Sequence, residues 1–154
     1  IEAGAQFVQS QYCYDVPMLR EYMKRVVDMG LHEKCFILIG VGPLASAKTA
    51  KWIRKNVPGV HIPDSIIARL EGADNQKEEG KRLCIDLMQE IREIEGVSGI
   101  HVMAYRQEDF VAEIVHDSGV LRDRHPWRRE LNQGDHAAIE FAEKQAATIA
   151  ATDT

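Results

Sequence analysis

Apolar and polar residues alternate along the chain in two patterns, one typical of strands and one typical of helices. Residues 6–14 alternate apolar and polar side chains, which predicts a strand that ends in a loop. Residues 35–41 form an uninterrupted apolar run, which predicts a strand covered on both faces, and residues 100–104 predict a third, short strand. Apolar residues at helical spacing predict helices over residues 16–29, 47–55, 64–71, 77–95 and 108–117.

The residues at the ends of these elements agree with the pattern. Asp15 and Ser46 are suited to cap the two helices that follow them, Pro17 lies in a first helical turn, and Gly30 ends that helix. Strands that alternate with helices imply βα units and a parallel sheet. The sequence therefore predicts an α/β fold.

Beyond Gly119 the composition of the chain changes. Four arginines crowd around a His-Pro-Trp segment in residues 122–130, and residues 135–150 form an alanine-rich stretch with one apolar side. Small apolar residues bury little area. We therefore divide the chain into an α/β part, residues 1–121, and an arginine-rich segment with a helical tail, residues 122–154.

Composition narrows the class of protein. The chain has 154 residues, 45% of them hydrophobic, and a formal net charge of −5. These values exclude disorder, and no apolar run approaches the ~20 residues that span a bilayer. The mild acidity argues against nucleic-acid binding, which needs a concentrated basic field. The chain begins at Ile1 rather than Met, so we expect a processed or partial chain.

Three widely spaced cysteines, Cys13, Cys35 and Cys84, form no Cys-x-x-Cys motif. An odd, sparse set in apolar surroundings indicates buried free thiols in a reducing compartment, which favours a cytoplasmic protein. No Cys/His pair has the spacing of zinc ligands, so no metal site is predicted.

A segment that resembles a phosphate-binding loop follows the second predicted strand. Residues 42–49 read GPLASAKT and nearly match the pattern GxxxxGK[ST]. Ala47 replaces the glycine that lets the backbone approach phosphate, and Pro43 removes one N–H from the cradle. An ordinary strand-to-helix connection with a solvated Lys48 is the favoured interpretation, and a nucleotide-binding loop is the disfavoured alternative.

Polar residues gather where two predicted strands end. Gln9, Ser10, Gln11 and Asp15 lie near the end of the first strand, where parallel βα sheets place ligand-binding groups. A glutamine there offers a donor and an acceptor to a heterocycle, or it is an edge-strand residue that neighbouring backbone satisfies. Both interpretations stay open.

The third predicted strand has a similar polar end. Tyr105, Arg106 and Gln107 follow this strand and are better placed to touch a ligand than His101 within it. A lone histidine in a strand is typically a hydrogen-bonded core residue, so we expect that role for His101.

Four segments in a consistent order carry a resemblance to a known family. The sequence is similar to the C-terminal half of methylenetetrahydrofolate reductase over residues 1–121. The segments that carry the resemblance are residues 4–15 (GAQFVQSQYCYD), 39–48 (IGVGPLASAK), 57–63 (VPGVHIP) and 96–103 (GVSGIHVM).

The resemblance implies a fold and an activity. The family fold is an eight-stranded (β/α)8 TIM-type barrel, which needs ~250 residues, so this chain would supply the last strands and helices of a partial barrel. The implied activity is an FAD-dependent oxidoreductase that takes hydride from NAD(P)H and reduces methylenetetrahydrofolate. The implied partners are the folate substrate, the remaining barrel half or a partner subunit, and further copies in a homo-oligomer, with no nucleic acid and no membrane.

The resemblance also implies roles for particular residues. Gln11 matches the glutamine that hydrogen-bonds the pterin of the folate. A family glutamine aligns with Thr49, and an aromatic that packs on the aminobenzoyl ring aligns with Ile53 or Trp52, so both positions depart from the family pattern. The last family contact, an arginine, aligns near Arg106 or Gln107. The general acid and the flavin contacts are expected in an N-terminal half that precedes Ile1, so no catalytic or cofactor-binding residue is assigned.

A second hypothesis belongs to another class of protein. A half-barrel that lacks catalysis would act as an interaction or assembly subunit, because three strands leave sheet edges that a partner must cover. The sequence alone leaves this alternative open.

Overall fold

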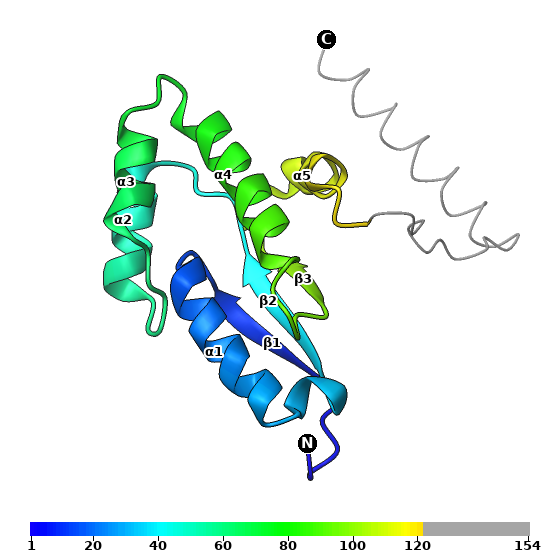
Figure 1. Ribbon diagram of the computed structural model, residues 1–154. Coiled ribbons are helices and arrows are strands. Elements are labelled where there is room, and N and C mark those ends of the chain that lie inside the picture. The colour runs from blue at the N-terminus through cyan, green and yellow to red at the C-terminus, as the bar shows by residue number, and fades with distance from the viewer. Residues whose placement is uncertain (122–154) are drawn as a thin grey trace, which may run out of the picture. The chain divides into compact units, whose positions relative to one another are not determined.

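The computed structural model describes residues 1–121 (Figure 1). The arginine-rich segment and the alanine-rich helix predicted within residues 122–154 lie outside the described residues. In chain order the elements are the strand β1 (Phe7–Tyr12), the helix α1 (Val16–Asp28), the 3-10 helix η1 (Leu31–Glu33), the strand β2 (Phe36–Val41), the helices α2 (Ala47–Asn56), α3 (Asp64–Glu71) and α4 (Gln76–Ile91), the strand β3 (Gly99–Val102), the 3-10 helix η2 (Glu108–Phe110) and the helix α5 (Val111–Ser118).

The described strands form one parallel sheet in the order β1-β2-β3. Phe7 pairs with Phe36 at the start of the sheet, and Gly40 pairs with His101 near its carboxyl edge. The α/β fold and the parallel sheet predicted from the sequence are confirmed. Three parallel strands, joined through helices, are consistent with part of a β/α barrel.

Helices cover one face of this sheet. Figure 1 shows α1 and α4 running across the same side of the strands. On that side Ile37, Ile39 and Val41 of β2 are buried, and Ile39 and Val41 pack with Met23 of α1 and Met88 of α4 in one core. The alternation of strand side chains directs every second residue of β2 into this core.

The prediction that residues 35–41 are covered on both faces is wrong for the described part of the chain. Phe36 is 65% exposed and Leu38 is half-buried on the face that the helices do not cover. β1 is more open still, with Phe7 56% and Val8 46% exposed. An apolar run identifies a strand without revealing which of its two faces is covered within the same chain.

The helices predicted within residues 1–121 are all present, and the ends of several of them are shifted. The helix predicted over residues 77–95 is α4, which ends at Ile91. The next turn is tighter, because the N–H of Ile94 donates to the carbonyl of Ile91, yet it still buries the Ile94 side chain. The helical spacing of buried apolar residues therefore continues past the last residue of α4. Likewise the helix predicted over residues 108–117 divides into η2 and α5.

Candidate functional site

The carboxyl edge of the sheet is built around a very close approach between neighbouring strands. At Gly40 of β2, an added Cβ atom would lie 2.7 Å from the carbonyl oxygen of Ser10 and 2.8 Å from that of Gln11. Any side chain at this position would collide with β1, so only glycine allows the backbones of β1 and β2 to lie this close together. The register of β1 also shifts between Gln9 and Tyr12, which is a bulge, and Ser10 Oγ accepts a hydrogen bond from the Gly40 N–H at 2.9 Å. Bulges of this kind re-aim side chains beside functional sites.

A cavity of about 260 Å³ lies beyond this edge. It collects side chains from the end of β1, from the β2–α2 connection, from α2 and from the segment after β3, so all three βα units contribute. Parallel β/α proteins place their ligand sites at this edge. The lining residues are Tyr12, Tyr14, Pro43, Ala45, Thr49, Ile53, Tyr105, Arg106 and Gln107.

Two stacked tyrosines form one wall of the cavity. The rings of Tyr12 and Tyr14 lie 5.8 Å apart at an interplanar angle of 15°. Tyr12 donates to the carbonyl oxygen of Met103 at 3.4 Å, and Tyr14 donates to that of Gly42 at 3.2 Å. Burial raises the pKa of both phenols, so they stay neutral donors at physiological pH. The stacked pair thus ties the end of β1 to the segments that follow β2 and β3.

The segment after β3 supplies another part of the lining. Gln107 is 9% exposed, and its Nε2 donates to the carbonyl oxygen of Pro43 at 3.1 Å, while its Oε1 is buried and has no hydrogen-bond partner. Arg106 has a φ of 56°, a left-handed conformation that is uncommon for a residue with a side chain. Its guanidinium lies 5.3 Å from the ring centre of Tyr105, which is 75% exposed. Unusual backbone conformations of this kind cluster at ligand sites.

The structure brings four of the five predicted site residues together. Thr49, Ile53, Arg106 and Gln107 line this one cavity. Of the two alternatives for the aromatic position, Ile53 is the one in the lining, and Trp52 is 61% exposed outside it.

Gln11 is the predicted site residue that the structure keeps apart. It is exposed and lines a neighbouring cavity of about 300 Å³, which is formed mainly by apolar residues of β1, β2 and α1. Tyr12 lines both cavities, and Gln11 precedes it in the chain. Consecutive residues of a strand direct their side chains to opposite faces, which accounts for the different lining roles of Gln11 and Tyr12.

The sequence analysis missed Tyr12 and Tyr14 as site residues. The signal was present, because the two tyrosines lie two residues apart at the end of a predicted strand and therefore share a face. Their bonds to the segments after β2 and β3 connect residues far apart in the chain, and no local pattern indicates such bonds.

Two backbone N–H groups of the segment that resembles a phosphate-binding loop already bond to neighbouring side chains. The Ala47 N–H donates to Gln76 Oε1 at 2.9 Å, and the Thr49 N–H donates to Ser46 Oγ at 3.1 Å. Ser46 caps α2 as predicted, and Lys48 is exposed. Because neighbouring side chains occupy these backbone donors, the structure favours the ordinary strand-to-helix connection.

His101 differs from its predicted role as a hydrogen-bonded core residue. It is half-buried, and its buried Nδ1 has no hydrogen-bond partner. The three cysteines are free as predicted, with Cys35 and Cys84 buried and Cys13 half-buried.

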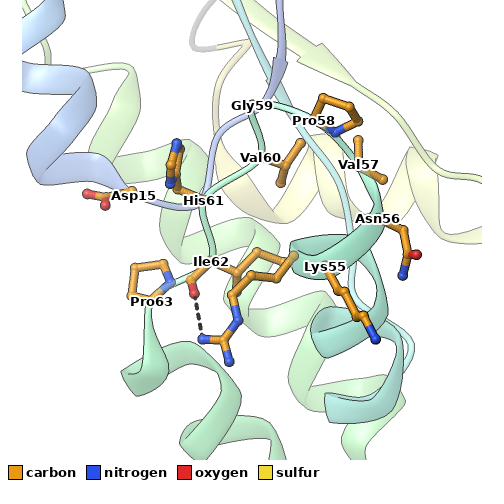
Figure 2. A pocket seen from close by; sticks show the side chains of 11 residues that line it. Asp15, Lys55, Asn56, Val57, Pro58, Gly59, Val60, His61, Ile62 and Pro63 are labelled. Atoms are coloured by element: carbon orange, nitrogen blue, oxygen red, sulfur yellow. Dashed lines mark hydrogen bonds between the residues drawn. The ribbon is translucent and has the colours of Figure 1, made fainter.

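A larger hollow of about 430 Å³ lies at the connection between α2 and α3 (Figure 2). Apart from Asp15, its lining is one continuous segment, Arg54 to Pro63, and it includes none of the five predicted site residues. Its arginine is engaged, because Arg54 Nη1 donates to the Ile62 carbonyl at 3.2 Å, the bond dashed in Figure 2, and pairs with Asp64 at 2.6 Å. This hollow is therefore a weaker candidate than the cavity at the carboxyl edge.

Two absences hold for residues 1–121. No group of three or more His, Cys, Asp or Glu side chains in this part of the chain is arranged to hold a metal ion. No helix within the same residues is long and apolar enough to cross a membrane.

Together, the parallel sheet and the cavity define a β/α protein with a candidate ligand site at the carboxyl ends of its strands. The family model of methylenetetrahydrofolate reductase matches residues 1–119, and the chain belongs to this family. Membership implies an oxidoreductase function of the methylenetetrahydrofolate reductase type, in a family that acts on folate and generally uses FAD and NAD(P)H. A search of curated proteins finds no match.

Proposed function

We propose that this chain forms the folate-binding side of a flavin-dependent methylenetetrahydrofolate reductase. Thr49, Ile53, Arg106 and Gln107 contact the folate in the cavity at the carboxyl edge, and Gln11 contacts its pterin from the adjoining cavity. The observation that carries the proposal is that four residues expected from the family resemblance line one cavity. The family match over residues 1–119 supports it. The position of the cavity agrees with where β/α barrels bind substrates.

The size and lining of the cavity fit one flat ring system. Ligand pockets run to roughly 300–1,000 Å³, and this cavity of about 260 Å³ is slightly smaller than that range. A whole flavin dinucleotide exceeds it. In this proposal FAD therefore lies against further strands of a completed barrel, and the residues described here hold the folate.

The chain's own residues then bind and orient the substrate. Tyr12 offers an aromatic face, Ile53 an apolar contact, and Gln107 a hydrogen-bond acceptor. Bound FAD would supply hydride transfer from NAD(P)H to the folate. The side chains of the cavity restrict the orientations of the folate, and this restriction supplies part of the catalytic effect.

A second candidate function rests on the open edge of β1. Among the described residues β1 pairs only with β2, and the exposed side chains of Phe7 and Val8 lie along it. Such an edge is a template for a further strand. A half-barrel subunit that assembles with a complementary β/α half or with further copies of itself would use this edge. Free cysteines agree with a cytoplasmic location in either case.

The test uses the completed barrel, in which this chain stands together with the further strands that the proposal requires, and measures FAD uptake by absorbance, NADH oxidation with menadione, and reduction of methylenetetrahydrofolate. We expect Gln11→Ala to slow the folate reaction about ten-fold and to leave NADH oxidation less affected, because its carboxamide contacts only the pterin. Gln89→Ala, an exposed glutamine of α4, is the matched control. A colourless protein that takes up no FAD would contradict the reductase proposal, and equal loss of both reactions would contradict the pterin contact.

A further inference from the structure

A buried acceptor without a partner points to a ligand group that the cavity at the carboxyl edge is built to receive. Gln107 is 9% exposed and lines this cavity, yet its Oε1 has no hydrogen-bond partner. More than nine in ten buried polar groups in proteins are hydrogen-bonded, and an unsatisfied one is costly. Because the Gln107 side chain lines a cavity, a bound molecule can supply the missing donor.

The orientation of the carboxamide follows from its other hydrogen bond. The carbonyl oxygen of Pro43 can only accept, so the NH2 group of Gln107 must be the end that lies 3.1 Å from it. This bond leaves Oε1, an acceptor, as the unsatisfied end. The ligand must therefore supply a donor.

The hydroxyl donors around the cavity are already engaged elsewhere. The phenols of Tyr12 and Tyr14 donate to the backbone carbonyls of Met103 and Gly42. The Thr49 hydroxyl shares a hydrogen bond with Ser46 Oγ at 3.1 Å. None of these hydroxyls is bonded to Gln107, so the protein itself does not satisfy Oε1.

We infer that Gln107 is a specificity-determining residue, whose Oε1 accepts a hydrogen bond from an N–H group of a flat heteroaromatic ligand. The inference rests on the proposed function and names the ligand chemistry that the cavity selects. The nearby tyrosine rings favour a flat ligand, and the buried acceptor favours one that carries an N–H group. A site built around such an acceptor rejects an analogue that lacks the donor, because the acceptor is then buried unpaired.

The test compares two pteridines of nearly the same shape. Lumazine carries N–H groups at ring positions 1 and 3, and 1,3-dimethyllumazine carries methyl groups there. Dissociation constants of both are measured by titration for the wild-type full chain, for Gln107→Met, which keeps the length of the side chain without its amide, and for Gln89→Met as an exposed control. We expect Gln107→Met to weaken lumazine about ten-fold and to change 1,3-dimethyllumazine less than about two-fold.

The outcomes separate this inference from the proposed function. Equal weakening of both pteridines by Gln107→Met indicates a merely structural role and overturns the inference, and so does unchanged binding of lumazine. If the wild-type protein binds folic acid and Gln107→Met gives either of these two results, the proposed function still stands. Wild-type protein that binds neither folic acid nor lumazine overturns both.

Discussion

Gly80 of α4 provides the sharpest test of how the cavity is positioned. It is buried in the second turn of the helix, directly against the backbone of Leu44 in the β2–α2 connection. A Cβ atom at this position would overlap the carbonyl oxygen of Leu44 and would lie 2.7 Å from its carbonyl carbon. Pro43, whose carbonyl oxygen accepts from the Gln107 amide, is the residue immediately before Leu44. Gly80→Ala therefore forces α4 away from the segment that carries the site.

The expected change in the free energy of unfolding on Gly80→Ala is the difference between two opposing effects. Alanine is a better helix former than glycine and favours the folded state by about 1 kcal/mol. Overpacking of a close contact costs about 1–3 kcal/mol, and the upper end applies here because the opposing atoms belong to backbone and no side-chain rotation relieves the overlap. We expect a net destabilisation of about 2 kcal/mol, which corresponds to a fall in Tm of about 4–8 °C.

The assay is urea unfolding of the full chain, followed by circular dichroism. Gly72→Ala is the matched control, because Gly72 ends α3 with a φ of −79° and an added Cβ there finds its nearest neighbour at an ordinary 3.5 Å. We expect this control to stay within about 0.5 kcal/mol of the wild type. If Gly80→Ala unfolds at the same urea concentration as Gly72→Ala, or at a higher one, the close approach of α4 to Leu44 is wrong.

Two further predictions concern the cap of α2 and the buried thiol of α4. Ser46→Ala removes the cap that accepts from the Thr49 N–H, so it should lower the free energy of unfolding by about 1 kcal/mol in urea, whereas Ser46→Gly should cost only a few tenths; equal losses would contradict the capping role. Burial raises the pKa of Cys84 from 9.0 to about 12, so the folded state keeps a proton that the unfolded state loses above about pH 9. Stability should therefore fall as the pH rises, by about 1.4 kcal/mol at pH 10 from this thiol, and Cys84→Ala should show a weaker pH dependence of its urea midpoint. A pH dependence that Cys84→Ala leaves unchanged would contradict this origin.

Local patterns were enough to predict the strands, the helices and two of the caps. The side chains of Asp15 and Ser46 accept hydrogen bonds from backbone N–H groups in the first turns of α1 and α2, as the sequence indicated. These features depend on residues within one turn of each other, so their signal is local. The end of α4 was misplaced because Ile94 is buried by a turn that is no longer helical.

The composition of the candidate site was harder to predict from the chain itself. The family resemblance located Thr49, Ile53, Arg106 and Gln107, and the structure places them on one cavity. The stacked tyrosines and the bulge at Ser10 depend on contacts between different strands. Such contacts are set by the register of the sheet, which the sequence does not state.

The bond between Gln107 and Pro43 also bears on how the protein is made. It joins residues 64 positions apart in the chain, and the bond between Tyr12 and Met103 joins residues 91 positions apart. Contacts of such long range close late in folding, because the intervening chain must first be ordered. On a ribosome, which releases the N-terminal part first, β1 and β2 are synthesised long before the segment that completes the cavity. The ligand site is therefore among the last parts of the nascent protein to form, and a truncated product that ends before Gln107 would carry a parallel β1–β2 pair but no complete cavity.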